Sequence, residues 1–425
     1  MSANGVRGTV LVVGGGITGI TAAVEAAEAG CAVVLVEKTP FLGGRVAGMH
    51  QYFPKLCPPQ CGLELHLRRV KQSPRIRVLT QAEVAQLAGT AGAFTATIRQ
   101  EPRGVTEACT ACGLCVEACP VEREDPTNYG MARTKAIHMA GPMAFPLRYA
   151  IDATTCEGAR CGRCEPACPV GAIDLAMQPR EEVVEAGAVI WATGWEPYAP
   201  ARLAELGFGT HPDIITNLMM ERLAAASGPT GGRIVRPSDG GPVSSVAFVQ
   251  CAGSRDENHL RYCSGVCCMA SLKQTRYVRD QLPEADISVF YIDIRSPGRL
   301  EDFYAASQLD PKLELIKGKV AAVTVSHDEH PLLVAAEDTV TGTRVRCAVD
   351  LVVLATGMVP APRGADVVEA ELPADAYGFL PGLDGGGGMV AAGCARRPAD
   401  VAASIRDATG AALAALTTCA QAGHG

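Results

Sequence analysis

The chain has 425 residues, of which 48% are hydrophobic, and a formal net charge of −7. At roughly 100 to 200 residues per domain, this length predicts two or three compact units. The acidic balance and the dispersed Lys and Arg residues exclude a basic face for nucleic acid or an anionic membrane. The start of the chain shows no apolar run of the kind that a secretion signal needs, and no stretch approaches the roughly 20 apolar residues that cross a bilayer.

The chain contains eighteen cysteines. A cytosolic redox poise keeps thiols reduced, so without an export signal these cysteines do not predict a disulfide scaffold. We therefore expect a cytoplasmic protein whose clustered cysteines serve metal or redox chemistry.

A glycine-rich turn opens the fold. An apolar strand at residues 9 to 13 is followed by Gly14-Gly15-Gly16-Ile17-Thr18-Gly19, a helix to Ala29, a second strand at 32 to 36, and Glu37. Glycines allow the backbone to approach a pyrophosphate at the helix N-terminus, and the acid can hold ribose hydroxyls. This order of elements predicts dinucleotide binding, and a tight packing turn is the weaker alternative.

Three further segments favour FAD over NAD by their resemblance to two-domain flavoprotein reductases. They are Phe41-Leu42-Gly43-Gly44-Arg45 and two strand ends, Ala192-Thr193-Gly194 and Ala355-Thr356-Gly357. Each strand end alone is an ordinary feature. The residues expected to bind FAD are Gly14, Gly16, Ile17, Thr18, Gly19, Glu37, Lys38, Gly43, Gly44, Arg45, Ala192, Thr193, Gly194, Thr356, Gly357 and Gly393.

Residues 102–180 form an apparent insertion rich in cysteine, glycine and proline. Its two cysteine runs are Cys109, Cys112, Cys115 and Cys119, and then Cys156, Cys161, Cys164 and Cys168, each followed by proline. The first has the spacing of bacterial ferredoxins, in which the fourth cysteine serves the other cluster. We therefore assign Cys168 to the 4Fe-4S cluster of the first run and Cys119 to that of the second. Structural zinc, which also uses four thiolates, is the weaker alternative.

The second nucleotide-type unit lacks a nicotinamide-binding turn. After the strand at 241–250 the sequence continues with Cys251-Ala252-Gly253-Ser254-Arg255, and Cys263, Cys267 and Cys268 follow. NAD(P)H binding is therefore not expected. The four cysteines fit either a third 4Fe-4S cluster or buried thiols that pack a helix. Cys57 and Cys61 remain unassigned between redox activity, ligation and loop packing.

These features predict an α/β flavoprotein with two dinucleotide-binding domains, similar to thioredoxin reductase, and an inserted ferredoxin domain with two 4Fe-4S clusters. The expected parts are 1–101, 181–240 and 346–425 for the FAD-binding domain, 102–180 for the ferredoxin domain, and 241–345 for the degenerate NAD(P)-like domain.

The sequence resembles the FAD-binding A subunits of heterodisulfide reductases and, more closely, the A subunit of the quinone-interacting membrane-bound oxidoreductase complex. The resemblance extends along the chain through KTPFLGGRVAG, YFPKLCPPQCGLE, CTACGLCVEACPVE, WATGWEPY, FVQCAGSRDENHL and YCSGVCCMASLKQ. It implies that Cys251, Cys263, Cys267 and Cys268 bind a third 4Fe-4S cluster near the flavin. It also implies that Lys273 lies at the isoalloxazine edge, where it stabilises reduced flavin.

The resemblance also implies a function in electron transfer. In the quinone-linked family, the complex connects the menaquinone pool to adenylylsulfate reductase on the cytoplasmic face of the membrane. Its other subunits are one with flavin and iron-sulfur clusters and one that bears haem and is embedded in the membrane. The longer heterodisulfide reductase relatives carry an additional N-terminal domain and a C-terminal ferredoxin. We expect neither part in this chain, and we therefore favour the quinone-linked family. The alternatives are a soluble subunit of the heterodisulfide reductase type, with or without electron bifurcation, an NAD(P)H-dependent reductase, and a scaffold with inert cofactors.

Overall fold

A computed structural model describes residues 8–141, 143–362, 373–382 and 387–422. The chain forms two compact units. Unit 1 comprises residues 1–47, 60–195 and 360–425, and unit 2 comprises residues 48–59 and 196–359.

The centre of unit 1 is a parallel five-stranded sheet in the order β22-β11-β1-β2-β3. Val10, Leu11 and Val12 of β1 are fully buried, as expected for a parallel strand covered on both faces. The strands and helices of this layer are β1 (Thr9–Val13), α1 (Ile17–Glu28), β2 (Ala32–Glu37), α2 (Gln60–Gln72), β3 (Ile76–Thr80), β11 (Ala188–Trp191), β22 (Met389–Ala391) and α8 (Val401–Ala422).

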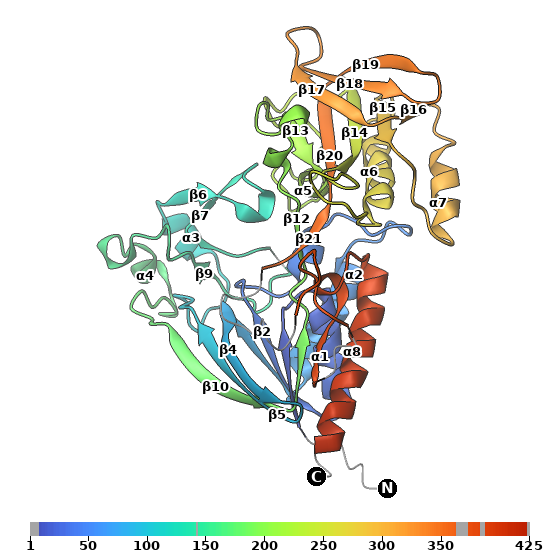
Figure 1. Ribbon diagram of the computed structural model, residues 1–425. Helices are drawn as coiled ribbons and strands as arrows, with labels where there is room; N and C mark the ends of the chain where they lie inside the picture. Colours follow the sequence, from blue (N-terminus) through green and yellow to red (C-terminus); the bar gives the residue numbers. More distant parts are fainter. Residues whose placement is uncertain (1–7, 142, 363–372, 383–386, 423–425) are drawn as a thin grey trace. The chain divides into compact units, whose positions relative to one another are not determined.

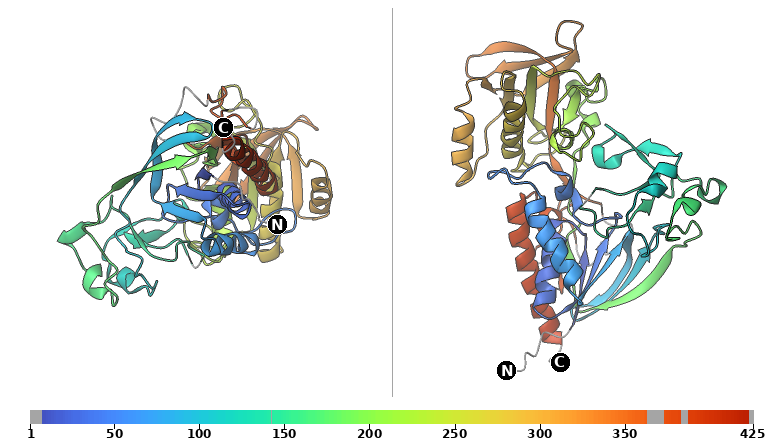
Figure 2. Two further views of the ribbon diagram at one scale, coloured as in Figure 1. Left: turned by 90° about the horizontal axis from the view of Figure 1, so that it is seen from below. Right: turned by 180° about the vertical axis from the view of Figure 1, so that it is seen from behind.

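Two alanine-rich helices pack against each other in unit 1. Figures 1 and 2 show α8 running beside α1, and the two helices are in contact. Ala22 and Ala26 of α1 and Ala411 and Ala415 of α8 are fully buried. Because alanine side chains are small, the helix backbones approach closely, and α8 fastens the C-terminal part of the chain to the first βαβ unit.

The cysteine-rich segment connects two neighbouring strands of a three-stranded antiparallel sheet, in the order β10-β5-β4. Gln100 at the end of β5 pairs with Arg180 at the start of β10. The expected ferredoxin insertion thus lies between two adjacent strand ends. The elements of this part are β4 (Ala82–Thr90), β5 (Ala93–Gln100), α3 (Leu114–Ala118), β6 (Glu122–Glu124), β7 (Arg133–Lys135), β8 (Ile137–His138), β9 (Ala150–Ile151), α4 (Cys164–Ala167) and β10 (Arg180–Ala186).

Unit 2 repeats the parallel design. Its five-stranded sheet has the order β13-β20-β14-β15-β16, and β17, β18 and β19 form a separate antiparallel sheet. The elements are β13 (Ile214–Thr216), α5 (Asn217–Ala224), β14 (Ser245–Ala252), α6 (Cys267–Gln281), β15 (Asp286–Tyr291), α7 (Leu300–Ser307), β16 (Leu313–Lys317), β17 (Val320–Val325), β18 (Leu332–Asp338), β19 (Thr343–Val349) and β20 (Leu351–Thr356).

The extent of unit 2 differs from the expected division of the chain. Residues 196–240 and 346–359, expected in the FAD-binding domain, lie in unit 2. The reason is strand pairing, because β20 lies between β13 and β14 in the sheet of unit 2. Apolar composition alone does not show which sheet a strand joins.

Among the described residues, no helix combines the length and the hydrophobicity needed to cross a membrane.

Candidate functional site

The glycine turn of unit 1 has no room for side chains at Gly14, Gly15 and Gly19. A Cβ atom at Gly14, which has φ +108°, would lie 2.3 Å from the carbonyl oxygen of Ala192, and one at Gly19 would lie 1.8 Å from that of Gly14. At Gly16, by contrast, a Cβ atom would meet nothing within 4 Å. Open space next to the N-terminus of α1 fits the approach of a pyrophosphate.

Glu37, at the end of β2, is bound to the turn. One carboxylate oxygen accepts a hydrogen bond from the backbone N–H of Gly15 at 2.6 Å, and the other accepts from the N–H and hydroxyl of Thr39, both at 2.7 Å. Glu37 is buried, whereas the neighbouring Lys38 is exposed. The expected ribose-binding acid therefore also holds the glycine turn in place.

The second pair of glycines lies against the first turn. The N–H of Gly43 donates to the carbonyl of Gly15 at 2.8 Å, and a Cβ atom at Gly44 would lie 3.0 Å from Cα of Gly16. The next residue, Arg45, donates to the carbonyl of Trp195 at 2.7 Å and lies over its ring.

The C-terminal segment reaches the same place, since a Cβ atom at Gly393 would lie 2.4 Å from the hydroxyl of Thr18. Expected FAD-binding residues from four parts of unit 1 thus surround the start of α1. The exceptions are Thr356 and Gly357, which lie in unit 2.

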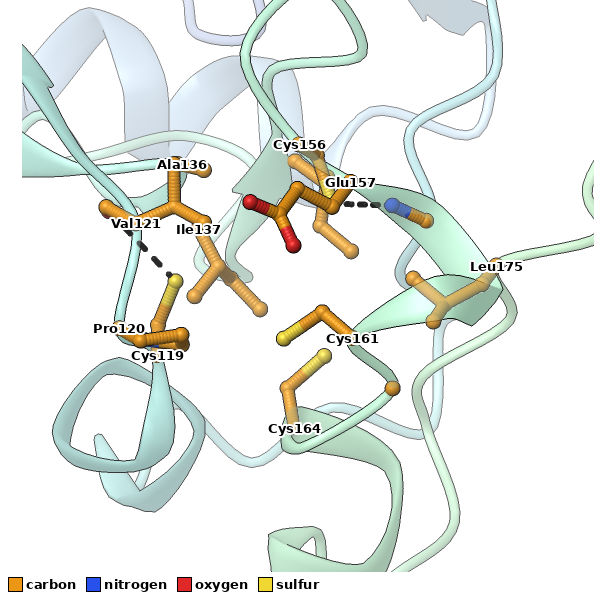
Figure 3. Close-up of a pocket in the computed structure, with 13 residues that line it drawn as sticks. Cys119, Pro120, Val121, Ala136, Ile137, Cys156, Glu157, Cys161, Cys164 and Leu175 are labelled. Carbon is orange, nitrogen blue, oxygen red and sulfur yellow. Dashed lines mark hydrogen bonds between the residues drawn. The ribbon is translucent and has the colours of Figure 1, made fainter.

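One cavity in the inserted segment brings together four cysteines from both runs. Its volume is about 330 Å³, and its lining includes Cys119, Cys156, Cys161 and Cys164. Figure 3 shows these side chains around a common space, with Ile137 and Leu175 on the surrounding wall. These are the four cysteines that the ferredoxin spacing assigns to the second cluster.

A second cavity, of about 280 Å³, gathers the other four cysteines, Cys109, Cys112, Cys115 and Cys168, and Tyr149 forms part of its lining. The interleaved assignment of Cys119 and Cys168 therefore agrees with the grouping in space. Within the described part of the chain, no group of three or more His, Cys, Asp or Glu side chains is arranged to hold a single metal ion.

The surroundings of these cysteines shift the thiol pKa in opposite directions at two positions. Burial, together with the nearby Cys109 and Cys112 thiolates, raises the pKa of Cys115 to about 11. Burial opposes ionisation of Cys168 as well, but backbone N–H groups of residues 170–173 outweigh it and lower the pKa of that thiol. Backbone donors of this kind fit a thiolate that binds iron, because metal binding requires the deprotonated form.

Four cysteines of unit 2 also lie near one another. β14 contains a bulge between Val249 and Ala252, and Cys251 within it has φ +56°. The backbone therefore departs from regular strand geometry at Cys251. Burial raises the pKa of Cys251 to about 11, and the neighbouring Cys268 and Cys263 thiolates act in the same direction. Burial also raises the pKa of Cys267, and the neighbouring Cys268, Cys251 and Cys263 thiolates add to this increase.

Gln250 precedes Cys251 and was not expected from the sequence. It is 5% exposed, and neither its amide nitrogen nor its oxygen has a hydrogen-bond partner among the described residues. An unsatisfied buried amide is costly. An unpaired polar side chain next to Cys251 fits a site for a bound group.

The connection that follows β14 differs from a nicotinamide-binding turn. The helix α6 does not begin until Cys267, and the intervening segment carries Cys263. Asp293, located just after β15 where a ribose-binding acid would stand, forms ion pairs with Arg255 and Arg295. Asp293 therefore already has two arginine partners at this strand end.

Lys273 of α6 belongs to a buried polar cluster in unit 2. Its side chain is 1% exposed and forms an ion pair with Glu221 at 2.9 Å, and it donates to the carbonyl of Gln51 at 2.7 Å. The Tyr277 hydroxyl donates to the other Glu221 oxygen at 3.2 Å. The acid that pairs with Lys273 comes from a different helix, which the sequence did not indicate.

Cys57 and Cys61, which the sequence left unassigned, have a partly exposed and an exposed position respectively. The Cys57 thiol contacts the Lys55 carbonyl at 3.9 Å. Neither cysteine lies in the lining of the two cysteine cavities described above.

Comparisons with known proteins agree with this division of cofactors. Residues 9–107 match the family of FAD dependent oxidoreductases, and residues 108–172 match the 4Fe-4S dicluster domain family. The expected cofactors, FAD and the 4Fe-4S clusters of the insertion, are therefore confirmed.

Solved structures show the fold. Thioredoxin reductases from T. acidophilum and Lactococcus lactis are similar with TM-scores of 0.52 and 0.53, at 13% and 12% sequence identity. Each comparison covers 97% of this chain, and 98% and 99% of the respective reductase. The expected fold class, similar to thioredoxin reductase with an inserted dicluster domain, is confirmed.

Curated relatives share much more sequence. The A subunit of the ferredoxin:CoB-CoM heterodisulfide reductase of Methanosarcina mazei is 41% identical over 93% of this chain and 51% of its own length. An iron-sulfur A subunit of the CoB-CoM heterodisulfide reductase of Methanopyrus kandleri is 39% identical over 96% of this chain and 64% of its own length. The chain thus spans between half and two thirds of these relatives, and it is a homologue of the FAD- and iron-sulfur-binding A subunits of heterodisulfide reductase.

Proposed function

We propose that the chain is an electron-transfer subunit of the heterodisulfide reductase A type, which works together with other subunits of a larger complex. The observation that carries this proposal is the grouping of eight cysteines around two cavities in the same unit as the glycine turn. A bound flavin can exchange electrons in pairs or singly, and 4Fe-4S clusters exchange them one at a time. This combination suits the transfer of electrons between partners.

The two cavities support an assignment of the cluster ligands. Cys109, Cys112, Cys115 and Cys168 hold one cluster, and Cys119, Cys156, Cys161 and Cys164 hold the other. We further propose that Cys251, Cys263, Cys267 and Cys268 hold a third cluster, supported by their mutual electrostatic interactions and by the unpaired amide of Gln250. Lys273 remains the residue that we propose to stabilise reduced flavin, and its pairing with Glu221 fixes the ammonium group within unit 2.

Cofactor analysis of the anaerobically purified chain tests this proposal. We expect one FAD and about twelve irons with equal sulfide if three clusters are bound, or about eight if only the insertion is loaded. Reduction in a potentiometric titration should bleach the flavin and produce cluster EPR signals. A chain whose flavin stays oxidised and whose clusters stay EPR-silent across the titration would be a scaffold, and the proposal would fail.

A narrower proposal concerns the partners. The phrases shared with the quinone-linked family support a complex with a haem-bearing membrane subunit that connects menaquinone to adenylylsulfate reductase. The homology to heterodisulfide reductase A subunits favours the broader assignment over this one. Electron transfer from the reduced chain to purified adenylylsulfate reductase, compared with transfer to heterodisulfide-reducing partner subunits, distinguishes the two. Rapid flavin bleaching by NADH or NADPH would instead favour an NAD(P)H-dependent reductase.

A further inference from the structure

Arg103 is a buried cation at the start of the inserted segment, three residues after β5 ends at Gln100. It is 6% exposed. Burying a charged side chain is costly unless a group of opposite charge lies nearby. The neighbours of Arg103 therefore show whether the protein supplies such a group.

All of the hydrogen bonds of the Arg103 guanidinium go to neutral acceptors. Its nitrogens donate to the carbonyls of Tyr149 at 2.8 Å, Arg148 at 2.9 Å and Pro40 at 2.7 Å, and to the Thr80 hydroxyl at 3.1 Å. The guanidinium carbon also lies 5.0 Å from the centre of the Phe41 ring. Within the part of the chain that the structure describes, no carboxylate forms an ion pair with Arg103. Hydrogen bonding is well satisfied, but the charge is not balanced.

The electrostatic surroundings point toward the cysteine cavity. Burial, together with the positive charge of Arg148, lowers the pKa of Arg103 to about 9, and the Cys109 thiolate acts in the opposite direction. The side chain thus stays protonated at neutral pH. The negatively charged group that favours its charge is a cysteine of the cavity lined by Cys109, Cys112, Cys115 and Cys168.

Two sets of contacts place Arg103 between this cavity and the flavin-binding turn. On one side it holds the backbone of Tyr149, whose side chain lines the cavity. On the other side it holds Pro40 and stacks on Phe41, two residues before Gly43, which binds the carbonyl of Gly15. All of these residues belong to unit 1.

We propose that Arg103 is the counter-charge of the cluster held by Cys109, Cys112, Cys115 and Cys168, and that it raises the reduction potential of this cluster. A cubane cluster with four thiolate ligands is negatively charged and gains another negative charge when it is reduced. A fixed cation nearby stabilises the reduced form more than the oxidised form. The inference rests on the cluster ligands proposed above.

At the other cavity, Arg160 and Arg163 precede the lining residues Cys161 and Cys164, but both are exposed, so water screens their charge. Among the residues that the structure describes, the buried cation next to this cavity has a carboxylate partner. Arg123, in the strand that follows Val121 of that lining, forms an ion pair with Asp152 at 3.1 Å, and both side chains are mostly buried. A neutral pair changes the potential of a nearby cluster much less than an isolated charge does. The charge of Arg103 therefore raises the reduction potential of the cluster held by Cys109, Cys112, Cys115 and Cys168 relative to that of the other cluster.

The test is a potentiometric titration followed by EPR on wild type, Arg103→Gln and Arg103→His, with the full chain loaded with clusters. We expect one transition to move to lower potential in Arg103→Gln by at least a tenfold change in the one-electron equilibrium constant, which is about 59 mV. Cys112→Ser, which alters a ligand of that cluster only, identifies the transition. Arg148→Gln is the matched control, because Arg148 is more exposed and pairs with Glu107 at 3.6 Å, so its removal should shift the transition less.

Arg103→His keeps the test valid if the glutamine variant does not load its clusters. At about pH 8 the imidazole is neutral, so this variant should also show the lower potential. An unchanged potential in a loaded Arg103 variant would overturn the inference and leave the cluster assignment intact. Absence of cluster iron in the wild type would instead overturn the assignment of the ligands.

Discussion

The central strands of the two parallel sheets, β1 and β14, occupy the same position in their sheets but lead into different connections. β1 ends at Val13 and α1 begins at Ile17, whereas β14 ends at Ala252 and α6 begins at Cys267. In unit 1 the short glycine turn brings the helix N-terminus to the strand end, where an anion binds. In unit 2 a longer segment carries Cys263 and places α6 with Cys267 and Cys268 at its start. The length and composition of one connection thus separate a dinucleotide site from a candidate cluster site.

The largest expected effect concerns the tight turn of unit 1. Gly19→Ala would force a Cβ atom to within 1.8 Å of the Gly14 carbonyl oxygen, so the turn must distort. We expect loss of FAD and a decrease of at least about 2 kcal/mol in the free energy of unfolding, as for other overpacked sites. Flavin absorbance after gel filtration and thermal unfolding measure the two effects.

Gly16→Ala is the matched variant, because a Cβ atom there meets no protein atom within 4 Å. It should unfold like the wild type but bind FAD more weakly, since the added methyl group fills the space left for the pyrophosphate. Full flavin content in Gly19→Ala would show that this turn is not the cofactor site.

The next effect tests the corresponding segment of unit 2. Replacing Cys251 or Cys267 by serine should lower the iron content from about twelve to about eight per chain, because a cluster that loses a buried ligand is not retained. Cys347→Ser is the control, since Cys347 lies in β19 and its thiol contacts Ser288 at 3.6 Å. Equal iron contents in all three variants and the wild type would mean that the cysteines of unit 2 only pack α6.

The next effect concerns stability alone, with no cofactor lost, in the polar cluster around Lys273. Lys273→Met leaves the Glu221 carboxylate buried without its cation, which should cost about 3–5 kcal/mol. Hydrogen exchange in α5 and α6 measures this loss locally. The double variant Lys273→Met/Glu221→Gln should recover much of it, because neither charge remains.

The flavin midpoint potential tests the proposed chemical role of Lys273 when the double variant is compared with Glu221→Gln, because these two proteins differ only in the ammonium group. The potential should be lower in the double variant if the ammonium stabilises reduced flavin. An unchanged potential would leave Lys273 with a structural role in unit 2.

The sequence predicted local features better than distant pairings. Three cysteines of each run line one cavity and the fourth lines the other, so the ferredoxin spacing indicated which side chains meet, including the exchange of Cys119 and Cys168. The glycine turn also lies within one short segment, so its residues were recognisable from the sequence. Glu221 and Lys273 meet only because α5 packs against α6, and the surroundings of Arg103 arise from segments far apart in the chain. Such contacts depend on tertiary packing, which spacing does not encode.

The smallest expected effect is a pH dependence of unit 2. Burial lowers the pKa of His50, and Lys273 contributes to this, although Glu221 and Asp280 act in the opposite direction. The His50 ring packs edge-on against Tyr277. The unfolded chain therefore takes up a proton at this residue before the folded chain does, and stability falls as the pH decreases below about 6.5. Hydrogen exchange in α6 at about pH 7.5 and pH 5.5 should show this loss in the wild type and a weaker one in His50→Gln. Identical pH dependence in the two would show that His50 is not the residue that makes unit 2 sensitive to acid.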